Sequence, residues 1–89
     1  MKRREVEVAN PQGLNAEAST KLAQIAATYL CDVSLTRSGR KVNAKSLMGV
    51  MMLAAAKGSH VVVEADGPDE TEALAAVVAL IAGDFDGEC

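Results

Sequence analysis

Two different periods of apolar residues alternate along this chain. At residues 4–9 charged and apolar positions take turns, which is typical of a strand with one buried face, so Val6 and Val8 are predicted to point into the core. A Pro and Gly loop at 10–13 ends the strand, and from residue 14 the apolar positions recur every three or four residues, as in a helix. The buried stripe of this helix is predicted to comprise Leu14, Ala18, Leu22, Ile25, Ala26 and Tyr29.

A hairpin and a short helix are predicted next. Alternation returns at 31–36, a turn occupies 37–40, and 41–44 completes the hairpin. Ser46 then opens a short helix, in which Gly49 costs about 1 kcal/mol relative to alanine, so packing must hold this helix together. Its apolar positions at helical spacing are Leu47, Val50, Met51 and Ala54.

The last third of the chain predicts a central strand and a third helix. Residues 60–65 form a β-branched run, and 66–70 start the helix with Pro68 near its first position and carboxylates beside its positive end. The resulting order, βαββαβα, predicts an α+β open-faced sandwich: a four-stranded, mostly antiparallel sheet covered on one face by three helices. The buried stripe of the third helix is predicted to comprise Leu74, Val77, Val78 and Ile81.

Length and charge restrict the classes of protein. The 89 residues predict a single domain over 1–89, with 83–89 as a frayed tail. A formal charge of −3 argues against nucleic acid as a partner. The longest apolar run, 50–56, falls far short of the roughly 20 residues that span a membrane, and 1–4 lack the apolar stretch of a secretion signal. We expect a cytoplasmic monomer.

The two cysteines predict no special chemistry. Cys31 and Cys89 form neither a metal-ligand spacing nor a disulfide framework, so no metal and no cofactor are expected. Cys31 is interpreted as a small buried apolar residue and Cys89 as part of the tail.

Two segments carry a resemblance to a known family. Residues 10–19 read Asn-Pro-Gln-Gly-Leu-Asn-Ala-Glu-Ala-Ser, and residues 42–51 read Val-Asn-Ala-Lys-Ser-Leu-Met-Gly-Val-Met. Both resemble the signatures of HPr, the bacterial phosphocarrier that passes a phosphoryl group from Enzyme I to sugar permeases. The resemblance covers about residues 4–81 and implies the same βαββαβα fold. It also implies that the histidine of a Gly-Leu-His-Ala-Arg motif carries the phosphoryl group.

This chain departs from that motif at two positions, Asn15 and Glu17. The amide nitrogen of Asn15 has a delocalised lone pair, so we expect no phosphoryl transfer there, and the Glu17 carboxylate repels a phosphate. Both residues suit a helix start, one as N-cap and the other beside the positive end of the dipole. The alternative is an altered binding surface in which Glu17 meets a basic partner.

Ser46 matches the serine that, in the family, is phosphorylated by an ATP-dependent HPr kinase. A phosphate at a helix start adds about −1.5 to −2 charge where the dipole tolerates it. The alternative is a plain N-cap. The resemblance also implies a docking surface that comprises Leu47, Met48 and Met51 together with Glu17. Among the Leu and Met residues of this short helix, Met48 is predicted to be the most exposed, followed by Leu47.

The leading hypothesis is therefore a regulatory binding module of the phosphotransferase system, a phosphoprotein and not an enzyme, whose partner is HPr kinase/phosphorylase or another regulatory protein. In logic it resembles the catabolite-repression HPr homologue of some Gram-positive bacteria, which has glutamine at the acceptor position. The alternative is a phosphocarrier altered at 15 and 17 or using another acceptor. His60, the one histidine, would be that acceptor, although its place at a strand start favours a plain surface residue. A scaffold without any phosphorylation is a third possibility.

Overall fold

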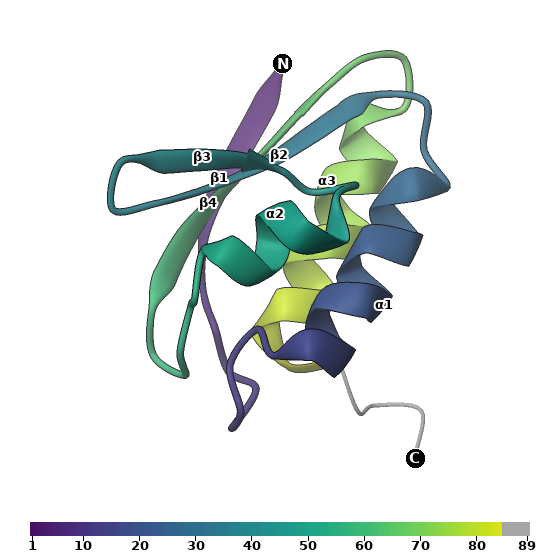
Figure 1. Cartoon of the computed structure of the whole chain (residues 1–89). Helices are drawn as coiled ribbons and strands as arrows, with labels where there is room; N and C mark the ends of the chain where they lie inside the picture. Colours follow the sequence, from purple (N-terminus) through teal and green to yellow (C-terminus); the bar gives the residue numbers. More distant parts are fainter. Residues whose placement is uncertain (85–89) are drawn as a thin grey trace.

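The computed structural model describes residues 1–84. Four strands form one sheet in the order β1-β4-β2-β3, and every neighbouring pair is antiparallel (Figure 1). The predicted sheet is confirmed, and His60–Asp66 is a central strand as expected. The strands are β1 (Lys2–Glu7), β2 (Asp32–Arg37), β3 (Arg40–Asn43) and β4 (His60–Asp66).

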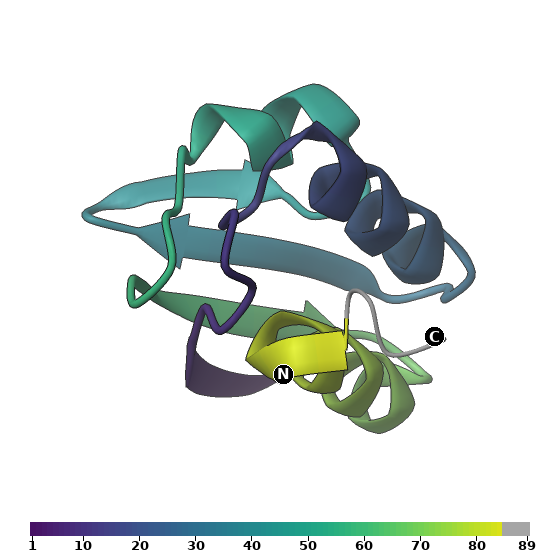
Figure 2. The same ribbon diagram turned by 90° about the horizontal axis from the view of Figure 1, so that it is seen from below.

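The helices lie on one face of this sheet. Figure 2 shows α3 beside the β1–β4 half of the sheet and α2 beside the β3 half. This arrangement confirms the open-faced sandwich. The helices are α1 (Ala16–Ala27), α2 (Leu47–Met52) and α3 (Glu70–Ala79), and a final turn of π type, η1 (Leu80–Asp84), includes the first two residues of the predicted tail. Its remaining residues, 85–89, with Cys89 among them, lie outside the described part.

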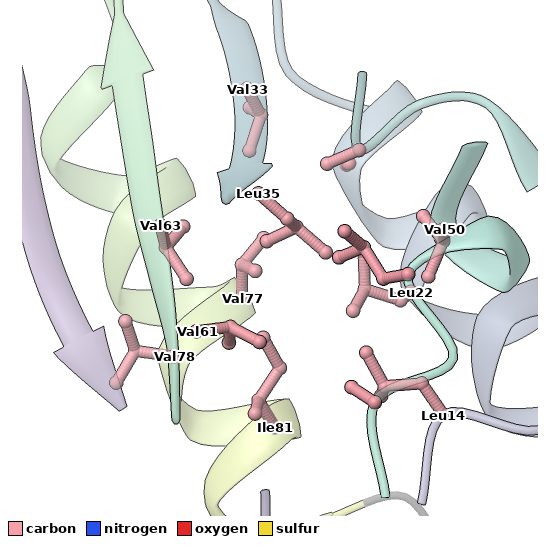
Figure 3. Close-up of a cluster of buried hydrophobic side chains, with 14 of the residues drawn as sticks. Leu14, Leu22, Val33, Leu35, Val50, Val61, Val63, Val77, Val78 and Ile81 are labelled. Carbon is pink, nitrogen blue, oxygen red and sulfur yellow. The ribbon is translucent and has the colours of Figure 1, made fainter. Parts of the chain in front are cut away.

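Side chains from both layers interdigitate in the core. In Figure 3, Leu35, Val61 and Val63 from the sheet meet Leu22 of α1 and Val77 of α3. Each of these five side chains is fully buried. Branched aliphatic residues fill this layer, because they combine a high strand propensity with dense packing.

Strand β1 begins and ends two residues earlier than predicted. Its pairing with β4 stops at Glu7, which lies opposite His60. Val8 is fully buried as predicted, but its amide donates to the Ser59 carbonyl at 2.8 Å and its carbonyl accepts from the Gly58 amide at 2.8 Å. The alternation of residue types therefore predicted the buried face of β1 correctly. The bounds of β1 depend instead on which backbone segment it hydrogen-bonds to.

One predicted buried position is wrong, and the short second helix ends earlier than its apolar spacing indicated. Ile25 is exposed on α1, while Ala23, which the predicted stripe omitted, is buried. Helix α2 ends at Met52, and the chain adopts a left-handed conformation at Ala54 (φ 52°), so Ala54 does not continue the helical spacing of Leu47, Val50 and Met51. A six-residue helix presents too little surface to bury more than Val50.

Helix α3 begins later than the sequence indicated. Pro68 precedes the helix, Asp69 is its N-cap residue and Glu70 its first member. The predicted stripe is otherwise confirmed at Val77, Val78 and Ile81, while Leu74 is half-buried against the core.

Candidate functional site

Asn15 is the N-cap of α1, as predicted. Its backbone is extended (φ −74°, ψ −174°), and its side-chain Oδ1 accepts a hydrogen bond from the Ala18 amide at 2.9 Å. The other end of the side chain is also engaged, since Nδ2 donates to Gln12 Oε1 at 2.8 Å. Both polar atoms of the Asn15 amide therefore serve the structure of the helix start.

The loop before α1 rests on the segment that follows α2. The Leu14 amide donates to the Ala55 carbonyl at 2.8 Å, and Gly13 has φ +68°. A Cβ at position 13 would overlap the Ala55 carbonyl oxygen and lie 2.9 Å from Ala56 Cα. Only glycine satisfies both the left-handed backbone and this close approach. Position 15 is thus held in place by main-chain contacts.

Glu17 lies exposed in the first turn of α1. The amides at a helix start carry partial positive charge, so the carboxylate is favourably placed for stability. The same charge occupies the place where a helix start would otherwise attract an anion. The entrance to α1 consequently combines a capped asparagine with a negative side chain.

Ser46 is the N-cap of α2 and is half-buried. Its Oγ accepts from the Gly49 amide at 3.1 Å, and its own amide donates to the Asn43 carbonyl at 3.0 Å. A Cβ at position 49 would lie 3.3 Å from that carbonyl oxygen and 3.4 Å from Ser46 Oγ. Gly49, which weakens the helix by propensity, therefore leaves room for the cap.

Four apolar side chains of α2 are exposed and form the surface that we call the α2 patch. Met48 is 70% exposed, as the sequence predicted for the most exposed member, but Met52 follows at 59%, ahead of Met51 at 41% and Leu47 at 39%. Met52 was missing from the predicted docking residues. Its spacing of four from Met48 was the signal that could have identified it.

The two candidate sites lie near opposite ends of α2, which carries the α2 patch. Helix α1 begins beside Ala55, just after α2, and ends beside Lys45, just before α2, because Lys45 Nζ donates to the Tyr29 carbonyl at 2.8 Å. Asn15 and Glu17 are therefore near the end of α2, whereas Ser46 lies at its start. The sequence pattern gave Lys45 no role. Its hydrogen bond to the Tyr29 carbonyl depends on the packing of α1 against α2.

Asp69 joins the start of α3 to the connection between α1 and β2. Its two carboxylate oxygens accept from the Leu30 and Cys31 amides, each at 2.9 Å. The hydrogen bond from the Leu30 amide is the main reason that the pKa of Asp69 is lowered. The carboxylate that was predicted beside the positive end of the helix also connects two distant segments.

Two further candidate residues, Cys31 and His60, lie in different environments. Cys31 is buried, and burial raises the pKa of its thiol, which disfavours a reactive thiolate. His60 is exposed at the start of β4, opposite Glu7. Within residues 1–84 no three His, Cys, Asp or Glu side chains gather as metal ligands. No helix in this described range has the length and apolar character needed to cross a membrane.

Comparison with known proteins identifies the family. The family model for the PTS HPr component phosphorylation site matches residues 2–83. The chain belongs to the HPr family. It is 53% identical over 85 residues to the phosphocarrier protein HPr of Cupriavidus necator, with 96% of each chain covered. It is therefore a bacterial-type protein of the phosphotransferase system.

Solved structures of HPr-family proteins have the same fold. The structure of HPr-C-His from Thermoanaerobacter tengcongensis superposes with a TM-score of 0.92 at 37% identity and covers 97% of both chains. Crh of Bacillus subtilis, the catabolite repression containing protein described as a swapped dimer, matches at 42% identity with a TM-score of 0.74, covering 91% of this chain and 93% of that one.

Proposed function

We propose that this HPr-family chain is a regulatory binding module of the phosphotransferase system, phosphorylated at Ser46 and unable to carry a phosphoryl group at position 15. The observation that carries the proposal is the contrast between the two helix starts. The Asn15 amide has no nucleophilic atom, and both of its ends are hydrogen-bonded. The half-buried Ser46 has a hydroxyl beside the exposed α2 patch.

Phosphorylation at Ser46 is compatible with the local geometry. The hydroxyl oxygen already accepts from the Gly49 amide, so phosphate oxygens would meet the free amides at the start of α2. The added charge would stand at one edge of the α2 patch and change its affinity for partners without refolding the helix. HPr kinase/phosphorylase is the proposed partner, and Leu47, Met48, Met51 and Met52 are the proposed docking residues.

Glu17 adds a second charge to this proposed surface. It is exposed near the end of α2, where the entrance to α1 contacts Ala55. A basic side chain of the partner would complement Glu17, while an Enzyme I surface that binds arginine-bearing relatives would not. We propose a single-domain, monomeric, cytoplasmic protein that is not itself an enzyme.

A working phosphocarrier is the second candidate function, favoured by the 53% identity to the HPr of Cupriavidus necator. It requires an acceptor other than Asn15. His60 is exposed, but it lies at the start of β4 and away from any helix start. Its imidazole therefore lacks the amides that stabilise a transferred phosphate at a helix N-terminus.

One experiment separates these functions. The protein is incubated with phosphoenolpyruvate and Enzyme I, and in parallel with ATP and HPr kinase, and phosphate is mapped by mass spectrometry. We expect phosphate at Ser46 from the kinase and none from Enzyme I. The Ser46→Ala variant is the matched control and should remain unmodified.

Phosphate on His60 from phosphoenolpyruvate would establish the second candidate and refute the first. The paired substitution Asn15→His with Glu17→Arg should restore transfer from Enzyme I if the docking surface is retained. Absence of phosphate in both incubations, with docking unchanged in Ser46→Ala, would favour a scaffold without phosphorylation.

A further inference from the structure

A hollow lies beside the α2 patch, where the β2–β3 hairpin meets the end of α2. Its volume is about 310 Å³. Figure 1 shows α2 lying between this hairpin and α1, so the hollow and the entrance to α1 flank α2 on different sides. The hollow is lined by Arg37, Ser38, Arg40, Met52, Leu53 and Ala54.

Two arginines stand together at this hollow. Arg37 and Arg40 are directly opposite each other in the β2–β3 ladder. Arg37 follows the buried Val33 and Leu35 at a spacing of two, so this pair belongs to the face of the sheet that the helices cover. Like charges in directly opposite positions destabilise a sheet. The hairpin nevertheless contains both arginines in opposite positions. Arg37 Nη1 donates a hydrogen bond to the Leu53 carbonyl at 3.0 Å.

Carboxylates of the chain neutralise other cations instead. Glu64 pairs with Arg3 and Lys41, and the N-terminal amine pairs with Asp66 and Glu70. Within residues 1–84 no carboxylate lies at ion-pair distance from Arg37 or Arg40. In a chain with a net charge of −3, this leaves a local positive site on an otherwise acidic molecule.

We propose that this hollow receives a carboxylate side chain of the protein that docks on the α2 patch. The inference rests on the proposed function, because it takes the patch as the docking surface. Met52 belongs to both the patch and the hollow. An apolar residue of the partner on Met52 therefore brings a neighbouring Asp or Glu to Arg37 and Arg40, whose planar guanidinium groups match a carboxylate with paired hydrogen bonds.

The position of this arginine site determines the orientation in which a partner can dock. Glu17 places a negative charge on the α1 side of α2, and the arginine pair places positive charge on the hairpin side. A partner must present a basic group to the first and an acidic group to the second. Such an arrangement selects one orientation of the partner, because the reversed orientation brings like charges together.

The test is a nuclear magnetic resonance titration of the full chain with N-acetyl-Glu-Leu-amide and with its matched neutral analogue, N-acetyl-Gln-Leu-amide. The Glu peptide is expected to shift the Arg37 side-chain Nε–H signal and the amides of Leu53 and Ala54. Because exposed charge pairs are weak, the Gln peptide should bind about two- to fivefold less tightly. Arg40→Gln, which retains the Arg37 contact with Leu53, should reduce binding of the Glu peptide by a similar factor.

Arg3→Gln, whose parent side chain pairs with Glu64, is the matched control and should leave peptide binding unchanged. Equal affinity of the two peptides, or full affinity in Arg40→Gln, would overturn the inference. Inorganic phosphate that binds as tightly as the Glu peptide would also overturn it in favour of a free-anion site. Peptide binding that persists where HPr kinase fails to dock would instead refute the proposed function and leave the carboxylate site standing.

Discussion

The residues around position 15 hold the start of α1 through both side-chain and main-chain contacts. The Asn15 side chain fixes the helix start, since its Oδ1 accepts from the Ala18 amide and its Nδ2 donates to Gln12 Oε1, while Gly13 and Leu14 fix the loop at the Ala55 carbonyl. The loop contacts involve main-chain atoms and a missing side chain, so they do not depend on which residue occupies position 15. Sequence reasoning predicted the N-cap because capping is local. It gave no sign of the contact with Ala55, which lies far along the chain from Gly13 and Leu14.

Gly13→Ala should destabilise the protein more than Gly39→Ala. Both glycines have positive φ, at +68° and +81°, but a Cβ at position 39 has open space while one at position 13 overlaps Ala55. We expect a loss of about 1–2 kcal/mol in unfolding free energy for Gly39→Ala from backbone strain alone. For Gly13→Ala the clash adds about 1–3 kcal/mol. Urea denaturation measures both, and equal losses would show that the close approach does not matter.

At the scale of elements, α2 combines a core residue with the proposed docking surface within six residues. Val50 is fully buried, and the four other large side chains of the helix are exposed. The sequence pattern placed Val50 among the apolar positions at helical spacing without assigning it to the core. It could not divide the remaining residues into buried and exposed, since Leu and Met suit both environments.

Two alanine substitutions on α2 should therefore have opposite effects. Val50→Ala is expected to lower the unfolding free energy by about 2–3 kcal/mol and leave docking of HPr kinase unchanged in the folded protein. Met48→Ala should change stability by less than about 0.5 kcal/mol and weaken docking. Urea denaturation and a binding titration with the kinase measure the two properties. A stable Met48→Ala variant with full docking would remove Met48 from the proposed surface.

The start of α3 depends on an ionised carboxylate. The pKa of Asp69 is lowered chiefly by the Leu30 amide, so the folded state favours the charged form. Its contribution is fully present above the ordinary aspartate pKa and is lost as the pH falls through the lower pKa of the folded protein, that is, below about pH 4. In Asp69→Asn we expect lower stability at neutral pH and a weaker loss of stability on acidification.

Denaturation series at several pH values would measure this effect. Glu72→Gln, an exposed substitution in the first turn of the same helix, is the control and should retain the steep acid dependence of the parent. An identical acid dependence in Asp69→Asn would mean that another group links α3 to the α1–β2 connection.

At the scale of the whole molecule, the fold was predictable for two reasons. The period of apolar residues marks each helix and strand, and the resemblance to the HPr family implies how these elements pack. The sequence did not predict features that depend on contacts between segments far apart in the chain. The Ser59 and Gly58 backbone sets the partner of Val8, and the hollow at Arg37 and Arg40 exists only because the hairpin meets the end of α2. Such contacts leave no periodic trace in the sequence.

The described chain completes its sheet with its own first strand, since β1 pairs with β4 of the same molecule. We therefore expect a monomer of 9.2 kDa in solution, although Crh of Bacillus subtilis is described as a swapped dimer. The charged residues of β1 disfavour edge-to-edge pairing with a second copy. Light scattering coupled to size-exclusion chromatography over a range of concentrations measures the mass. A mass near twice that of the chain would refute the prediction.

The contact between Gly13 and Ala55 has an evolutionary consequence. Because the path of the loop before α1 is set by Gly13 and by the Leu14 hydrogen bond to Ala55, a substitution at position 15 alters the cap of α1 and leaves the path of the loop in place. On the function proposed above, a phosphoryl carrier and a regulatory module can therefore share one backbone and differ at few positions. The reverse change, Asn15→His with Glu17→Arg, relies on the same loop geometry that Gly13 provides.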